Sequence, residues 1–260
     1  MTRLDELFAR TRAEGRAALV GYLPVGFPSY EDSVAAMVAM VEGGVDMVEV
    51  GVPYTDPGMD GPVIQVAVDA ALRAGSRVAH VFDAVRAVTE HAPAVVMGYW
   101  NPIEKLTPAV FAQRLADAGG SGAITPDLIP EEAGPWLEAA REHDLDPVFL
   151  VAPSSSDERL EVVGRTNRGF VYAASTMGVT GTRDVVSNRA EELVARMREH
   201  TDLPIGVGLG VSNGAQAAEV ARYADAVIVG SAFVRALGDE GVDAVRRLAA
   251  DLAAGVRRTA

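Results

Sequence analysis

The sequence has no cysteine among its 260 residues. Disulfide bonds, thiol nucleophiles and thiolate metal sites are therefore excluded. Basic residues are also few, since 23 Lys and Arg stand against 36 Asp and Glu and give a net charge of −13. Nucleic acid and anionic membranes both reward clustered Lys and Arg, so this acidic balance disfavours them. We expect neither as a partner.

The sequence also lacks a long apolar run, and none approaches the roughly 18 residues of a membrane-spanning helix. The first ten residues, MTRLDELFAR, indicate a charged amphipathic helix without the apolar core of a signal peptide. We therefore expect a cytoplasmic protein. With 49% hydrophobic and 23% charged residues, the composition is that of a globular protein with a sizeable core.

Short apolar runs alternate with helical patterns along the chain. The runs are typical of buried strands and lie at residues 17–22, 46–51, 94–99, 121–125, 147–152, 169–174, 204–208 and 225–229. The helical patterns lie at residues 30–43, 62–75, 78–91, 108–118, 131–143, 157–165, 187–199, 213–221 and 239–256. Such strand–helix units predict a (β/α)8 TIM barrel, an α/β fold, preceded here by one extra N-terminal helix. No linker-like stretch divides the chain, so we expect residues 1–260 to form a single domain.

An open, doubly wound sheet is the alternative arrangement. It normally carries a Gly-rich dinucleotide-binding turn after its first strand. Residues 21–26, GYLPVG, do not have that motif. The barrel is therefore the favoured fold, and it places an active site at the carboxyl ends of the strands.

Histidine and lysine are poorly placed for chemistry in such a barrel. The histidines fall in or at the ends of predicted helices, three of them just before a strand and so at the end away from the site: His80, His91, His143 and His200. No lysine ends a predicted strand, and Lys105 lies in a predicted loop with residues 101–104. We therefore expect no metal site, no histidine base and no Schiff-base lysine.

Glycine-rich turns follow the last three predicted strands. They are residues 178–181 (GVTG), 206–212 (GVGLGVS) and 230–231 (GS). Glycine lets backbone N–H groups approach an anion closely, and a helix N-terminus adds a favourable dipole. One such turn would be ordinary loop chemistry. Three at neighbouring strand ends predict a phosphate-binding site.

Carboxylates remain as candidates for acid–base chemistry. Glu49 shares one face of an apolar strand with Met47, where an unpaired charge costs several kcal/mol. It is therefore functional, paired to a distant Arg, or turned to solvent at the strand end. Asp56 and Asp60 lie in the following Gly- and Pro-rich loop, where each also fits an ordinary turn. A rigid and a mobile carboxylate in different surroundings can take opposite acid and base roles.

Five segments of the sequence together form a motif pattern that is highly specific for one protein family. They are residues 49–65 (EVGVPYTDPGMDGPVIQ), 97–102 (MGYWNP), 126–132 (PDLIPEE), 178–181 (GVTG) and 230–231 (GS). On these segments the chain resembles the α subunit of tryptophan synthase, and the match runs from the N-terminal helix to the last barrel helix. The resemblance implies a lyase of tryptophan biosynthesis that cleaves indole-3-glycerol phosphate to indole and glyceraldehyde 3-phosphate, with no cofactor or metal in this chain.

The resemblance also implies residue roles. Glu49 would be the proton shuttle that protonates indole C3 and deprotonates the glyceryl hydroxyl. Asp60 would accept from the indole N–H and stabilise the positive charge that develops there. Thr180 would pair with Asp60 when a lid closes over the site, and Tyr172 would line the site near Glu49. The phosphate positions would be Gly181, Gly210, Gly230 and Ser231.

A partner follows from the same resemblance: a separate β subunit that uses pyridoxal phosphate, receives indole through a tunnel and forms an α2β2 heterotetramer. The loops at residues 53–60 and around Thr180 would face it. The loop departs from the family pattern: Thr55 and Val63 replace commoner Ser and Thr, and Gly58-Met59 replaces Leu-Ala. These changes bear on contact with the β subunit more than on chemistry.

Two other functions stay open. Another phosphate-sugar barrel enzyme, such as an isomerase or cyclase of histidine or indole biosynthesis, would require a paired acid and base on other strands, or a strand-end lysine. A subunit that mainly activates a partner enzyme, with little activity of its own, would not need Glu49 and Asp60. The presence of both residues argues against it.

Overall fold

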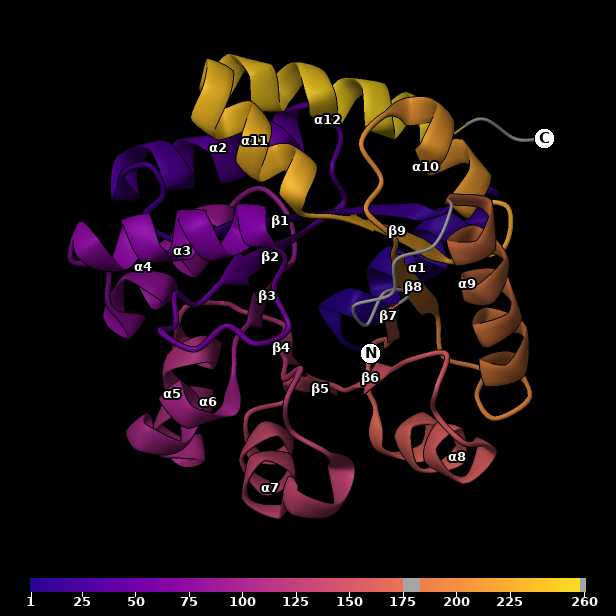
Figure 1. The fold of residues 1–260 in the computed structure, drawn as a ribbon. Helices are drawn as coiled ribbons and strands as arrows, with labels where there is room; N and C mark the ends of the chain where they lie inside the picture. The colour runs from indigo at the N-terminus through magenta and orange to yellow at the C-terminus, as the bar shows by residue number, and fades with distance from the viewer. Residues whose placement is uncertain (175–182, 258–260) are drawn as a thin grey trace.

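The strands form one parallel sheet that closes into a barrel (Figure 1). The computed structural model describes residues 1–174 and 183–257. Within them the sheet order is β5-β4-β3-β2-β1-β9-β8-β7-β6, and every pairing is parallel. The strands are β1 Ala18–Pro24, β2 Met47–Gly51, β3 Ala94–Met97, β4 Gly122–Ile124, β5 Asp146–Val148, β6 Leu150–Val151, β7 Val171–Ala174, β8 Ile205–Gly208 and β9 Ala226–Val229. The edge strands β5 and β6 are two halves of one strand, which confirms the predicted barrel.

Helices surround the strands, and α1 (Arg3–Ala13) lies across one end of the barrel (Figure 1). The others are α2 Tyr30–Glu42, α3 Pro62–Arg73, α4 Val78–Thr89, α5 Trp100–Leu106, α6 Pro108–Asp117, α7 Gly134–Glu142, α8 Asp157–Thr166, α9 Arg183–Arg198, α10 Gly214–Val220, α11 Ser231–Glu240 and α12 Val242–Val256. In the described part of the chain, no helix has the length and apolar character needed to cross a membrane.

The fifth strand is interrupted at Phe149, whereas the apolar run predicts a continuous strand over residues 147–152. The cause is the buried side chain of Asn167. The Phe149 N–H donates to Asn167 Oδ1 at 3.1 Å, and Asn167 Nδ2 donates to the Phe149 carbonyl at 3.1 Å. A side-chain amide thus replaces a neighbouring strand at this residue. Asn167 also donates to the Phe170 carbonyl at 3.0 Å, which ties β7 to the break.

Helix boundaries differ from the prediction at three places. The predicted loop at residues 101–104 is part of α5, which also contains Lys105. The predicted helix over residues 239–256 corresponds to α12. It is preceded by α11, which was not predicted as a helix, and the two separate at Gly241 with φ of 81°. A 3-10 turn at Pro130–Glu132 precedes α7, so the predicted helix over residues 131–143 begins later.

The barrel interior is closed at its N-terminal end by α1. Leu4, Leu7 and Phe8 of this helix belong to a buried cluster with inward-facing strand residues such as Val20 and Met47. Thr2 caps α1 and donates from Oγ1 to Oδ2 of the buried Asp146 at 2.8 Å, which fixes the helix to β5. The opposite, carboxyl end is left for a ligand.

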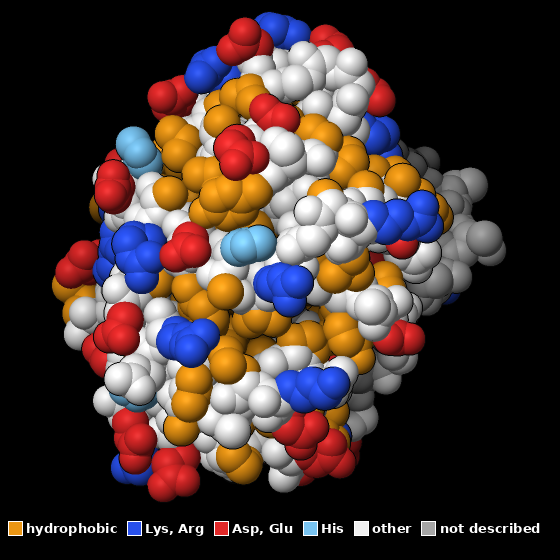
Figure 2. Space-filling model, turned by 90° about the vertical axis from the view of Figure 1, so that its left-hand side faces the viewer, with side chains coloured by type: hydrophobic (Ala, Val, Ile, Leu, Met, Phe, Trp, Pro, Cys, Tyr) orange, Lys and Arg blue, Asp and Glu red, His pale blue; other side chains and the backbone are white. Residues whose placement is uncertain are grey.

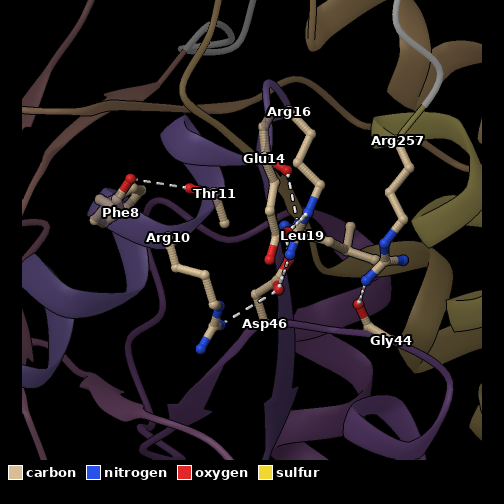
Figure 3. A network of polar contacts seen from close by, with 10 residues as sticks. Phe8, Arg10, Thr11, Glu14, Arg16, Leu19, Gly44, Asp46 and Arg257 are labelled. Carbon is tan, nitrogen blue, oxygen red and sulfur yellow. Dashed lines mark hydrogen bonds and ion pairs between the residues drawn. The ribbon is translucent and has the colours of Figure 1, made fainter.

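Polar contacts brace the N-terminal end of the barrel (Figure 3). The Arg16 guanidinium donates to both oxygens of Asp46, at 2.7 and 2.8 Å, and the Leu19 N–H donates to the same carboxylate at 2.9 Å. A cavity of about 280 Å³ also lies at this end, between Phe8 and Asp225. Because barrel enzymes react at the other end, we assign these contacts to stability.

The helical surface carries charges of both signs. On the side of the molecule that Figure 2 shows, acidic and basic side chains are interspersed among apolar ones. Four of the ion pairs among the described residues lie within single helices, including Arg73–Asp69 at 2.8 Å in α3 and Arg86–Asp83 at 3.0 Å in α4. Exposed pairs of this kind are worth about 0.5 kcal/mol each. They are typical of solvated helix faces.

Candidate active site

A cavity of about 260 Å³ opens at the carboxyl ends of the strands. It is lined by each predicted site residue that the structure describes, namely Glu49, Asp60, Tyr172, Gly210, Gly230 and Ser231. These residues come from β2, the loop before α3, β7, the loop after β8 and the start of α11. The two remaining predicted residues, Thr180 and Gly181, lie outside the described residues. Residues far apart in the sequence thus meet at one end of the barrel.

Glu49 faces the barrel interior on β2 and is 1% exposed. Its neighbour on the same strand face, Met47, belongs to the buried cluster that fills the barrel. Oε1 of Glu49 has no hydrogen-bond partner among the described residues, and none of them forms an ion pair with it. The two structural explanations, a solvent-facing side chain or a pair with a distant Arg, are therefore wrong. Burial raises the pKa of Glu49 to about 8.

Asp60 lies in the loop between β2 and α3, two residues before the helix begins. Burial raises the pKa of Asp60 to about 6, although a hydrogen bond from the Tyr99 hydroxyl acts in the opposite direction. The two carboxyl groups therefore share one cavity but differ in acidity. Near neutral pH, Glu49 is mostly protonated while Asp60 is mostly ionised.

The loop that carries Asp60 is held by residues after β3. The Met59 N–H donates to Tyr99 Oη at 3.0 Å. The ring of Tyr99 lies 5.4 Å from that of Tyr54, whose hydroxyl accepts from Asn101 Nδ2 at 2.9 Å. The segment at residues 97–102 therefore positions the loop beside Asp60.

The end of the cavity where phosphate binding was predicted is lined by Gly210, Gly230 and Ser231. Gly230 precedes α11, and Ser231 is the first residue of this ten-residue helix. The first N–H groups of a helix have no partner within it, and they attract anions together with the helix dipole. Gly210, which also lines the cavity, has φ of 66°, a conformation that glycine adopts without strain.

Several lining residues were not predicted as site residues. Tyr22 is the most notable, because it is the Cα register partner of Glu49 on the neighbouring strand β1. The two-residue periodicity of β1 could have identified it, since Tyr22 shares a face with Val20. The remaining unpredicted wall is largely apolar and suits an aromatic ligand; it includes Ile64, Met97, Leu150 and Ile228.

Two glycines make room for the cavity tyrosines. A Cβ added to Gly51 would lie 2.6 Å from Tyr22 Oη, and one added to Gly208 would lie 2.7 Å from Tyr172 Oη. Real Cβ contacts are not that short, so the two rings occupy space that only glycine leaves free. The strand ends thereby fix where both hydroxyl groups lie.

Other candidates lie outside the cavity. Asp56 accepts from Thr55 Oγ1 at 2.6 Å on the exposed part of the loop and does not line the cavity. His80 is in α4 and His143 ends α7, on the outer helices. Among the side chains that the structure describes, no three His, Asp or Glu residues come together in a way that could hold a metal ion.

Comparison with known proteins gives one consistent family. The family model described as tryptophan synthase alpha chain matches residues 8–258. A tryptophan synthase alpha chain from Mycobacterium intracellulare is 60% identical over 260 residues, which is 100% of this chain and 96% of the relative. One from Acidothermus cellulolyticus is 60% identical over 262 residues, covering 99% of this chain and 98% of the relative.

Solved structures agree with the sequence relatives. A structure of Mycobacterium tuberculosis tryptophan synthase superposes with a TM-score of 0.94 at 56% identity, covering 99% of each chain. The alpha subunit from Legionella pneumophila gives a TM-score of 0.90 at 29% identity, covering 98% of each chain. Since family model, relatives and structures span nearly the whole sequence, the chain belongs to the tryptophan synthase alpha chain family.

Proposed function

We propose that Glu49 and Asp60 are the catalytic acid–base groups of this lyase of tryptophan biosynthesis. The reaction is the cleavage of indole-3-glycerol phosphate to indole and glyceraldehyde 3-phosphate. The observation that carries the proposal is the pairing of two carboxyl groups of unequal acidity in one cavity, with pKa values of about 8 for Glu49 and about 6 for Asp60. Carboxyl groups separated in this way can take opposite roles.

Glu49 supplies the proton that starts the reaction. Its protonated form donates to C3 of the indole ring, and Asp60 accepts from the ring N–H and stabilises the positive charge on the ring. The Glu49 carboxylate then takes the proton of the glyceryl hydroxyl. The electrons of that O–H bond form the carbonyl of the aldehyde, while the electrons of the breaking C–C bond return to the ring. Indole leaves and Glu49 is protonated again.

The phosphate group anchors the substrate at the other end of the cavity. Gly210 and Gly230 offer backbone that an anion can approach, and Ser231 adds a hydroxyl at the start of α11. Gly181 joins these positions in the proposal, and Thr180 pairs with Asp60. Tyr172 lines the cavity close enough for the Glu49 charge to raise its pKa further above the value that burial sets.

We further propose a β subunit as the partner, with pyridoxal phosphate bound in that subunit, and an α2β2 assembly in the cytoplasm. The loop at residues 53–60 and Thr180 form the proposed contact face. Met59 in this loop is a large apolar side chain that is 40% exposed, so a partner can bury it. Size-exclusion chromatography of the mixed subunits tests the assembly, and cell fractionation tests the location.

An indole-release assay tests the catalytic proposal. The purified chain receives indole-3-glycerol phosphate with and without a β subunit, beside an Asp60→Asn variant. We expect indole from the unaltered chain in both conditions and a loss of about 100-fold or more in the variant. No indole in either condition would instead favour the alternative, a weakly active regulatory subunit that mainly activates the β subunit.

A further inference from the structure

The side chain of Tyr22 lines the substrate cavity but has no part in the chemistry described above. Its ring lies along the cavity wall, with one edge near Gly230 and the hydroxyl near Gly51. A Cβ added to Gly230, at the phosphate end, would lie 3.3 Å from Tyr22 Cδ1, while one added to Gly51, at the end of β2, would lie 2.6 Å from Tyr22 Oη. The hydroxyl is thus held beyond the phosphate end, on the side of the strand that carries Glu49.

The Tyr22 hydroxyl makes no hydrogen bond with the side chains and backbone that the structure describes, and the residue is only 7% exposed. Burial raises its pKa well above the ordinary value, and the charges of Asp60 and Glu49 raise it further. The group is therefore an intact O–H donor at neutral pH. Because Tyr22 lines the cavity, this hydroxyl can donate to a ligand there, whereas a Phe ring would fill the same wall without offering a donor.

The substrate offers few polar groups that could satisfy this hydroxyl. The indole ring has one polar group, the N–H, and this group donates its hydrogen bond to Asp60 in the proposed reaction. The phosphate lies at the opposite end, against backbone and Ser231. Between them lie the hydroxyl groups of the glyceryl chain. Glu49 acts on one of these, and another remains without a protein partner in the proposed reaction.

We propose that Tyr22 Oη hydrogen-bonds a glyceryl hydroxyl of the bound substrate and makes the site specific for a hydroxylated phosphate side chain. The inference rests on the proposed function, since it takes the substrate and its orientation from there. Tyr22 is thus a substrate-binding residue on a rigid strand, beside the proton shuttle. The position of the Tyr22 side chain is set by β1 and does not depend on the loop that carries Asp60.

The test is Tyr22→Phe, which removes the hydroxyl and keeps the ring. Tyr30→Phe is the matched control, because Tyr30 lies at the start of α2 with its ring 5.5 Å from that of His80, outside the cavity. For each protein, kcat and KM are measured with indole-3-glycerol phosphate. Calorimetry then gives dissociation constants for glycerol 3-phosphate, inorganic phosphate and indole.

We expect Tyr22→Phe to lower kcat/KM by about fivefold to tenfold, the equivalent of one neutral hydrogen bond. Glycerol 3-phosphate should bind more weakly by a similar factor, while phosphate and indole bind as before. Tyr30→Phe should change none of these values. A purely structural role for Tyr22 would instead weaken all three ligands together.

Three results would overturn the inference. Equal kcat/KM in Tyr22→Phe and the unaltered, active enzyme would reject it while leaving the proposed function intact. Uniform weakening of every ligand would reject it in favour of a structural role. No indole release by the unaltered enzyme would reject the proposed function and this inference with it. If Tyr22→Phe does not fold, Gly51→Ala, which displaces the hydroxyl, provides the same comparison.

Discussion

Tyr22 and Glu49 are register partners on the neighbouring parallel strands β1 and β2, and both side chains line the cavity at the carboxyl ends of the strands. Two pairs earlier in the same register, and therefore on the same strand faces, Val20 and Met47 point into the barrel core. The strands therefore deliver a phenol and a carboxylic acid side by side at the barrel mouth. Strand positions are more rigid than loop positions, so these two groups are placed before substrate binds.

Gly51 keeps Tyr22 in place, so Gly51→Ala should disturb the site without removing a polar group. The new Cβ would come within 2.6–2.8 Å of three atoms of the Tyr22 side chain, two in the ring and the hydroxyl oxygen, and would force the ring to move. We expect kcat/KM to fall about tenfold or more, because small displacements of substrate-positioning groups are costly. Gly134→Ala, where no atom lies within 4 Å of the new Cβ, is the control. Similar activity in both variants would contradict the packing argument.

The acidities of the two carboxyl groups predict a bell-shaped pH profile. Asp60 must be ionised, so kcat/KM should rise with pH through about 6, the pKa of Asp60. Glu49 must be protonated, so kcat/KM should fall through about 8, the pKa of Glu49. The measurement is kcat/KM between pH 5 and 9. In Asp60→Asn the residual activity should lose the rise near 6, and an unchanged rise would argue against Asp60 as its origin.

Ionisation of the buried Glu49 should lower the free energy of unfolding, and Glu49→Gln should remove this loss. The pKa of Glu49 is raised from 4.5 to about 8, so between these values the native state binds a proton that the unfolded state releases. Stability from this group is therefore lost as pH rises through that window, at up to about 1.4 kcal/mol per pH unit. Urea denaturation at pH 6, 7 and 8 should show a growing advantage of Glu49→Gln. The exposed Glu90→Gln should show none.

The break in the fifth strand should depend on Asn167. Its buried amide makes three hydrogen bonds, two to Phe149 and one to Phe170. Asn167→Ala leaves these backbone groups without partners and should lower the free energy of unfolding by about 2–4 kcal/mol. Asn101→Ala, which removes one exposed hydrogen bond to Tyr54, should cost about 1 kcal/mol or less. Equal losses would show that the Asn167 contacts carry no special weight.

The sequence was sufficient to predict the barrel, because each buried strand appears in it as a short apolar run. The position of Glu49 could also be predicted: its face on β2 follows from alternation with Met47, which the structure places in the core. The glycine-rich turns predicted where backbone would line the cavity, and Gly210 and Gly230 do line it.

Other features depend on contacts that no local pattern contains. Phe149 leaves the strand because Asn167, 18 residues later, binds its backbone. In the sequence Tyr22 has the pattern of an ordinary strand residue. Only the pairing of β1 with β2 shows that it lies beside Glu49. The single domain over residues 1–260 stays a prediction. The roles of Thr180 and Gly181 also stay predictions, since both residues lie outside the described part of the chain.

The most direct test of the mechanism is indole release by Glu49→Gln. This substitution keeps the size and burial of the side chain but removes the proton that it donates and recovers. We predict that indole release falls by at least about 100-fold while binding of glycerol 3-phosphate stays nearly intact. Substantial turnover of indole-3-glycerol phosphate by this variant would contradict the role of Glu49 as the proton shuttle.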